Sequence, residues 1–100
     1  MGNKCSRSNV KAKKWLSEHG YSEIHIFGHS RWQSDLNFKN LKFDGIALSS
    51  TKLCLFQVKS NGKPTKAYLA LMEAFAKDYG ADILWFNCPD YKDIEVYGLF

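Results

Sequence analysis

The clearest pattern in the chain is a pair of apolar runs separated by a short polar gap. Residues 43–48 and 53–59 are rich in β-branched, aliphatic and aromatic side chains, and residues 49–52 between them are polar. This arrangement is typical of two strands joined by a four-residue loop. The centre of the chain is therefore predicted to be a β-hairpin.

The expected register of this hairpin brings polar side chains together at one end. If Leu48 and Leu53 form the last pair before the loop, Asp44 stands directly opposite Gln57 on one sheet face. Lys59 lies two residues beyond Gln57, so the alternation of a strand places it on that face as well. The opposite face is predicted to be core and carries Cys54, Phe56 and Val58.

The segment before the hairpin is predicted to hold one helix and one strand. Residues 8–19 carry apolar side chains at the spacing of a helix face, and Gly20 is expected to end that helix. Residues 22–28 alternate between apolar and polar, which predicts a strand. Residues 1–7 are polar and expected to fray, whereas residues 29–40 are polar and irregular and predict a long loop.

The segment after the hairpin is predicted to hold a second helix and two strands. Residues 65–79 form the helix and Gly80 caps it. Residues 83–86 are almost continuously apolar, as in a strand buried on both faces, and residues 94–100 are expected to form an edge strand. A helix between two buried strands indicates a crossover to a parallel neighbour. The helix stripe that we expect in the core consists of Tyr68, Leu71, Met72, Phe75 and Tyr79.

These elements predict a fold of the α/β (α+β) class. A chain of 100 residues is long enough for one hydrophobic core and too short for two, so residues 1–100 are expected to form a single domain. Its architecture is expected to be a central mixed sheet with a β-hairpin core, flanked by two helices.

Charge and cysteine usage narrow the class of protein. The net charge of +4 and the pI near 9.0 favour a polyanionic partner such as DNA or RNA, although many basic proteins bind no nucleic acid. The cysteines at positions 5, 54 and 88 have no CxxC spacing, which is typical of the reducing cytoplasm. We therefore expect a cytoplasmic protein.

A membrane attachment is not expected. No apolar run approaches the ~18 residues that span a bilayer. The first residues fit a short N-myristoylation pattern with Gly2 as the acceptor. That pattern is brief enough to arise by chance, and we discount it.

The motif formed by Asp44 and then Gln57-Val58-Lys59 resembles the signature of PD-(D/E)XK nucleases, in the variant where Gln replaces the second acid. The order of helix, strand, Asp44, hairpin and second helix is similar to small Holliday-junction-resolvase-like and VRR-NUC-type members. The resemblance covers most of the chain and implies a restriction-endonuclease-like fold. It also implies a metal-dependent DNA endonuclease, either structure-specific or nonspecific.

The resemblance assigns roles to the motif residues. Asp44, Gln57 and Lys59 would be catalytic, with Lys59 orienting or deprotonating the attacking water. Asp44, the Gln57 side-chain carbonyl and the Val58 main-chain carbonyl would hold Mg²⁺ or Mn²⁺, with Asp35 as a further candidate ligand. Relatives often carry an acid on the first helix, and here the nearest equivalent is the uncharged Asn9. Since Gln57 is also neutral, we expect weak metal binding and a preference for Mn²⁺.

Basic side chains near the motif are candidates for phosphate contacts, although such a stripe can also be a solvated helix face. We expect the partner to be branched or duplex DNA, bound by a homodimer, because a domain with a radius of gyration of about 13 Å is too small to cover both strands of a junction. The candidate nucleic-acid-binding residues are Arg7, Lys11, Lys14, Arg31, Lys63 and Lys66.

Other interpretations remain open at this point. The same fold could be a nucleic-acid-binding module that has lost cleavage, because Gln57 replaces an acid. Alternatively, the chain could be an unrelated small basic protein in which Asp44 and Lys59 form an ordinary surface ion pair.

Overall fold

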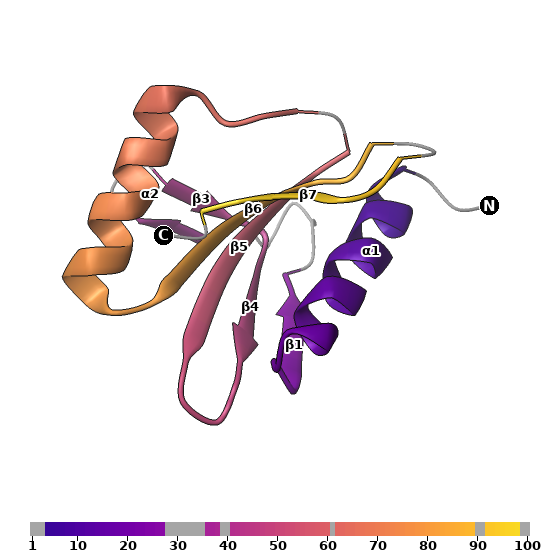
Figure 1. Cartoon of the computed structure of the whole chain (residues 1–100), viewed down its shortest axis with the longest axis horizontal. Coiled ribbons are helices and arrows are strands. Elements are labelled where there is room, and N and C mark those ends of the chain that lie inside the picture. Colours follow the sequence, from indigo (N-terminus) through magenta and orange to yellow (C-terminus); the bar gives the residue numbers. More distant parts are fainter. Residues whose placement is uncertain (1–3, 28–35, 39–40, 61, 90–91, 99–100) are drawn as a thin grey trace.

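The hairpin predicted from the sequence lies at the centre of a five-stranded mixed sheet (Figure 1). The structure is a computed structural model, and it describes residues 4–27, 36–38, 41–60, 62–89 and 92–98. Within those residues, the elements in chain order are α1 (Lys4–Glu18), β1 (Glu23–Ile26), β2 (Leu36–Phe38), β3 (Leu41–Phe43), β4 (Gly45–Leu48), β5 (Leu53–Lys59), α2 (Lys66–Tyr79), β6 (Asp82–Asn87) and β7 (Glu95–Tyr97).

The sheet has the strand order β1-β4-β5-β6-β7. The register predicted for the hairpin is confirmed, since Leu48 pairs with Leu53 and Ala47 pairs with Cys54. Strand β6 runs parallel to β5 and is reached through α2, as the sequence predicted, while β1 and β7 are antiparallel edge strands. The α/β (α+β) class with two flanking helices is therefore confirmed.

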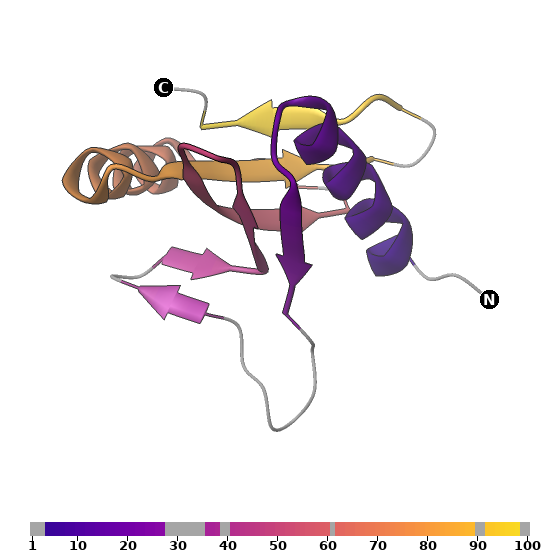
Figure 2. The ribbon, with the colours of Figure 1, turned by 90° about the horizontal axis from the view of Figure 1, so that it is seen from below.

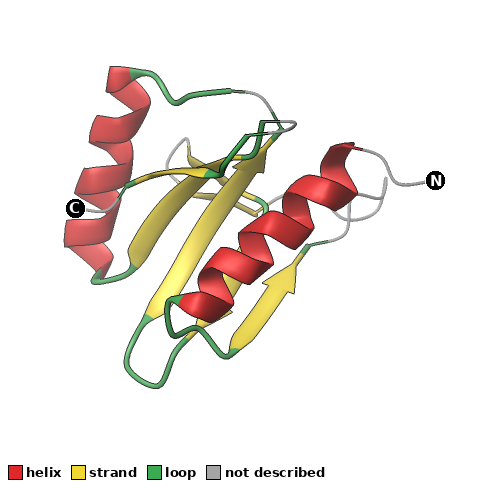
Figure 3. Ribbon diagram, turned by 45° about the vertical axis from the view of Figure 1, so that its right-hand side comes forward, coloured by secondary structure: helices red, strands yellow, loops and turns green. Residues whose placement is uncertain are grey.

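One helix covers each face of the sheet (Figure 3). On one face, Ala12 and Leu16 of α1 are fully buried against Phe56 and Phe86 of the sheet. On the other face, Met72 of α2 packs into a second cluster that includes residues of β3, β5 and β6. The alternation of β5 explains this division, because Cys54 and Phe56 face α1 whereas Leu55 faces α2.

Helix α2 ends at the expected glycine, and it begins one residue after the predicted start, with Thr65 as its N-cap. The Thr65 side chain accepts a hydrogen bond from the main-chain N–H of Tyr68 at 3.1 Å, and Gly80 closes the helix in the left-handed conformation (φ 66°). Leu71 and Tyr79 were predicted to be core, but they are 42% and 56% exposed. The face of the helix that packs against the sheet is instead centred on Met72 and Phe75. Leu69 and Ala76 are partly buried beside them.

Two segments differ from the sequence prediction. Helix α1 begins at Lys4, so part of the segment expected to fray is helical. Strand β2 pairs antiparallel with β3 and forms a separate two-stranded ribbon, although residues 29–40 were expected to be irregular. Figure 2 shows this ribbon set apart from the main sheet. Leu41 and Phe43 of the ribbon are buried in the cluster with α2, and this burial stabilises a strand pair too short to be predicted alone.

None of the helices in the described part of the chain is long and apolar enough to cross a membrane.

Candidate functional site

Asp44 lies at the bend between β3 and β4 and is fixed to β5 by two hydrogen bonds. Its main-chain N–H donates to the carbonyl of Phe56 at 2.8 Å, and its carboxylate Oδ2 accepts from the N–H of Val58 at 2.8 Å. The prediction that Asp44 stands directly opposite Gln57 is wrong. The regular ladder ends at the pair Gly45–Phe56, and the bend shifts the register by one residue at Asp44.

The Asp44 carboxylate is thus placed by main chain rather than by a counter-ion. The residue is 9% exposed. Within the described residues, its second oxygen, Oδ1, has no hydrogen-bond partner, and no ion pair joins Asp44 to Lys59. The surface ion pair considered as an alternative is therefore not formed.

Gln57 is buried on the α2 face of β5, with 6% of its surface exposed. Its Oε1 accepts a hydrogen bond from the Tyr68 hydroxyl at 2.8 Å. That hydroxyl in turn accepts from the main-chain N–H of Lys42 at 3.1 Å. The Gln57 side-chain oxygen, which was predicted to bind metal, therefore accepts a hydrogen bond from Tyr68 of α2.

Lys59 lies at the end of β5, half-buried, with its Nζ 5.9 Å from the centre of the Trp85 ring. Such a placement is in the range of a cation–π contact. Trp85 is itself held by a hydrogen bond from its Nε1 to the carbonyl of Gly62 at 2.9 Å and by an edge contact with Tyr68. The Lys59 ammonium group thus lies near a Trp85 ring whose position is held by Gly62 and Tyr68.

The donor set for a divalent cation is small. Within the described residues, no group of three or more His, Cys, Asp or Glu side chains is arranged to hold a metal, and Asp35 lies outside those residues. Asp44 Oδ1 is the strong anionic donor that the described site offers, to be completed by neutral carbonyl oxygens such as that of Val58. Carboxylate and carbonyl oxygens suit Mg²⁺ and Mn²⁺, so this set fits a weakly held ion.

Several of the predicted cations gather at the carboxyl end of β5 and β6. Lys63 and Lys66 are exposed in the segment that leads from β5 into α2. Lys11 reaches the same end from α1, since its Nζ donates to the carbonyl of Pro89 at 3.0 Å. Lys14 is exposed on α1, over the other face of the sheet from Gln57. The Arg7 side chain and Arg31 lie outside what the structure describes.

Sequence reasoning missed Tyr68 and Trp85 as site residues. Both were placed in the core from their apolar spacing, and both are indeed largely covered. Their polar ends nevertheless contact the motif, because the Tyr68 hydroxyl binds Gln57 and the Trp85 ring lies under Lys59. Buried Tyr and Trp side chains usually find a polar partner, and that tendency was the available signal.

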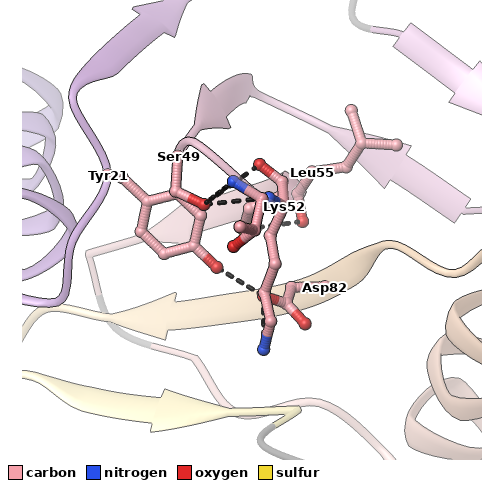
Figure 4. Close-up of polar contacts among 7 residues, drawn as sticks. Tyr21, Ser49, Lys52, Leu55 and Asp82 are labelled. Atoms are coloured by element: carbon pink, nitrogen blue, oxygen red, sulfur yellow. Dashed lines mark hydrogen bonds and ion pairs between the residues drawn. The ribbon is translucent and has the colours of Figure 1, made fainter.

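A second polar cluster lies at the opposite end of the sheet and was not predicted. The Tyr21 hydroxyl donates to Asp82 Oδ2 at 2.5 Å, and Lys52 Nζ lies 4.0 Å from the same oxygen (Figure 4). Burial raises the pKa of Tyr21, and the bond to Asp82 raises it further. These residues line a surface cavity of about 570 Å³. The cluster joins the start of β6 to the hairpin loop and to the segment after α1.

Comparison of the chain with protein-family models, curated proteins and solved structures finds no match. The candidate site therefore rests on its residues and geometry alone.

Proposed function

We propose that this protein is a metal-dependent nuclease that hydrolyses phosphodiester bonds in DNA, either at branched structures or without specificity. The observation that carries the proposal is the fixed position of Asp44, whose carboxylate is bonded to the main chain of Val58 between the motif residues Gln57 and Lys59. A buried carboxylate whose second oxygen has no partner among the described residues is a suitable ligand for a divalent cation.

The roles of the side chains follow from their chemistry. Asp44 would hold the cation, which when bound offsets the negative charge of the phosphodiester and polarises its oxygen atoms. Lys59 would orient the attacking water and stabilise negative charge that develops on the phosphate. The Trp85 ring restricts where the Lys59 ammonium can lie, which reduces the freedom lost on reaching a reactive geometry.

Substrate binding would depend on the phosphate backbone. Lys11, Lys63 and Lys66 lie around the same end of the sheet as the motif. Such contacts position a duplex and do not read its sequence. The radius of gyration of 13.0 Å supports the proposal that two copies act together on a branched substrate. Sedimentation with and without a four-way junction tests that part.

A binding module without cleavage is the second candidate. It is favoured by the bond from Tyr68 to Gln57, which uses one of the two lone pairs of the neutral side-chain oxygen at the position of the second acid. Under this alternative, the site would hold DNA through its cations and would not hydrolyse it.

The test is cleavage of a labelled four-way junction, a linear duplex and a single strand in Mg²⁺, Mn²⁺ or EDTA. The variants are Asp44→Ala and Lys59→Ala, with Lys77→Ala as a matched control, since Lys77 lines the cavity at the far end of the sheet. A nuclease cuts only with metal, loses cutting in both site variants and keeps it in the control. Binding without cutting would favour the module, and the absence of salt-dependent DNA binding would overturn both proposals.

A further inference from the structure

The hydrogen bonds of Tyr68 favour one orientation of the Gln57 amide, with its carbonyl end toward α2. A main-chain N–H can only donate, so the bond from Lys42 N at 3.1 Å uses the Tyr68 hydroxyl as an acceptor. The hydroxyl proton is then available to Gln57 Oε1 at 2.8 Å, a shorter contact than the 3.5 Å to the carbonyl of Lys42. The carbonyl end of the Gln57 side chain therefore faces Tyr68.

The amide nitrogen of Gln57 is consequently directed away from Tyr68. It carries two N–H groups, and no residue in the described part of the chain accepts a hydrogen bond from either of them. The residue is 6% exposed, so these donors have little access to water in the free protein. Buried donors without a partner cost free energy and are rare in folded proteins, so amide donors that no described residue satisfies are suited to bind a ligand.

The surroundings select the chemistry of that partner. Lys59 offers an ammonium group on the same face of β5, two residues along the strand. Two neighbouring donors, one of them charged, favour an oxygen that bears negative charge. A glutamate at position 57 would be an acceptor and would repel such an oxygen, whereas the glutamine present here attracts it.

We propose that Gln57 is a phosphate-binding residue rather than a metal ligand, and that its amide N–H groups donate to a nonbridging oxygen of a bound phosphodiester beside Lys59. The inference rests on the proposed function for the identity of the ligand. It also goes beyond that function, because it predicts that the site binds the DNA backbone without metal.

The first experiment measures binding in EDTA, where cleavage plays no part. A short DNA duplex is titrated into the ¹⁵N-labelled protein, and the side-chain amide signals of Gln57 are followed by nuclear magnetic resonance. We expect these signals to shift on binding, and we expect Gln57→Leu and Gln57→Glu to lower duplex affinity by roughly tenfold. Ser50→Leu provides a control change from a polar side chain to leucine, since Ser50 is exposed in the hairpin loop at the opposite end of the sheet.

The second experiment measures binding of Mn²⁺ alone by calorimetry. Gln57→Leu is expected to leave Mn²⁺ affinity unchanged, whereas Gln57→Glu is expected to raise it by adding a carboxylate. Far-UV circular dichroism checks that each variant is folded.

The outcomes separate the inference from the proposed function. Duplex binding that shifts the Gln57 amide supports the inference even if the wild-type protein never cuts DNA. Duplex binding that leaves this amide unshifted and is insensitive to Gln57→Leu overturns it, even if cleavage is observed. A loss of Mn²⁺ affinity in Gln57→Leu would also overturn it, because Gln57 would then be a metal ligand.

Discussion

The Asp44 carboxylate accepts a hydrogen bond from the main-chain N–H of Val58 at 2.8 Å, and this contact ties the start of β4 to the last residues of β5. A main-chain donor cannot move independently of its strand. The carboxylate is therefore positioned by the sheet itself, and its place does not depend on the Lys59 side chain. This explains how the buried Asp44 carboxylate keeps its position although no described cation forms an ion pair with it.

We expect Asp44→Ala to lower the free energy of unfolding by about 2 kcal/mol, because the variant leaves the Val58 N–H without its acceptor. Asp44→Asn keeps an acceptor but loses its charge, so a smaller loss of about 1 kcal/mol is expected. Urea denaturation measures both values. Asp93→Asn is the control, since Asp93 is exposed. An Asp44→Ala variant as stable as the wild type would show that the Val58 bond contributes nothing.

Trp85→Phe tests the hydrogen bond that holds the Trp85 ring in place near Lys59. The variant keeps an aromatic ring near the ammonium but removes the 2.9 Å bond from Nε1 to the Gly62 carbonyl. We expect a loss of stability of about 1 kcal/mol. Faster hydrogen exchange is expected at the Gly62 amide, which is bonded to Asn87 Oδ1 at 3.0 Å. Unchanged exchange at Gly62 would mean that Asn87 alone holds the loop.

Gly45→Ala is expected to be strongly destabilising. A Cβ at this position would lie 2.4 Å from Cζ of Phe56 and 2.6 Å from the His25 carbonyl oxygen, and neither a main-chain atom nor a fully buried ring can move away easily. We expect a loss of about 3 kcal/mol, read as a drop of melting temperature. Gly62→Ala is the control, because its nearest neighbour would be Lys59 Cβ at 3.9 Å. Equal melting temperatures for the two variants would contradict the argument.

The parts of the fold that were predictable depend on local periodicity. Leu48 and Leu53 could be paired from the sequence because a four-residue loop leaves few possible registers. The parallel neighbour followed from a helix placed between two apolar runs. Strand β2 was not predictable, since Leu36–Phe38 is stabilised through Leu41 and Phe43, which are buried by contacts distant in sequence.

The residues of the candidate site were proposed from the sequence, but their hydrogen bonds could not be predicted from it. The motif indicated Asp44, Gln57 and Lys59, yet the bend at Asp44 shifted it away from the position opposite Gln57. The role of Tyr68 depends on β3 reaching α2, because the Lys42 N–H orients the hydroxyl. The sequence pattern of β3 and that of α2 do not show that these two elements come into contact.

Stability is expected to fall at alkaline pH. Burial raises the pKa of the Cys88 thiol from 9.0 to about 11, and nearby Lys11 lowers it in part. Burial also raises the pKa of Cys54 and of Tyr21. Because the folded protein holds the Cys88 proton more tightly than the unfolded chain, the contribution of Cys88 is fully present below about pH 9 and is lost as the pH rises through about 11. The raised pKa values of Cys54 and Tyr21 act in the same direction.

Urea denaturation between pH 8 and pH 11 checks this dependence. The free energy of unfolding is expected to be level at the lower end and to decrease steadily above about pH 9. Cys88→Ala should make the decrease shallower, because one of the shifted groups is gone. A free energy that stays constant up to pH 11 would contradict the expected protonation of the buried thiols.

The salt dependence of DNA binding tests which end of the sheet binds the DNA. Each phosphate contact contributes about −0.9 to the slope of log affinity against log salt for duplex DNA. If Lys63 and Lys66 both contact phosphates, the double alanine variant should bind more weakly and lose roughly two units of slope. The measurement is fluorescence anisotropy of a labelled duplex in EDTA at several salt concentrations.

The chain offers a control of equal charge for this measurement. Lys52 and Lys77 line the cavity beside Asp82 at the other end of the sheet, so their double alanine variant has the same net charge as the first. Its slope should match that of the wild type if binding is local to the carboxyl end of β5. Equal losses in both variants would mean that overall charge, rather than this surface, drives association, because a diffuse attraction does not distinguish where a lysine lies.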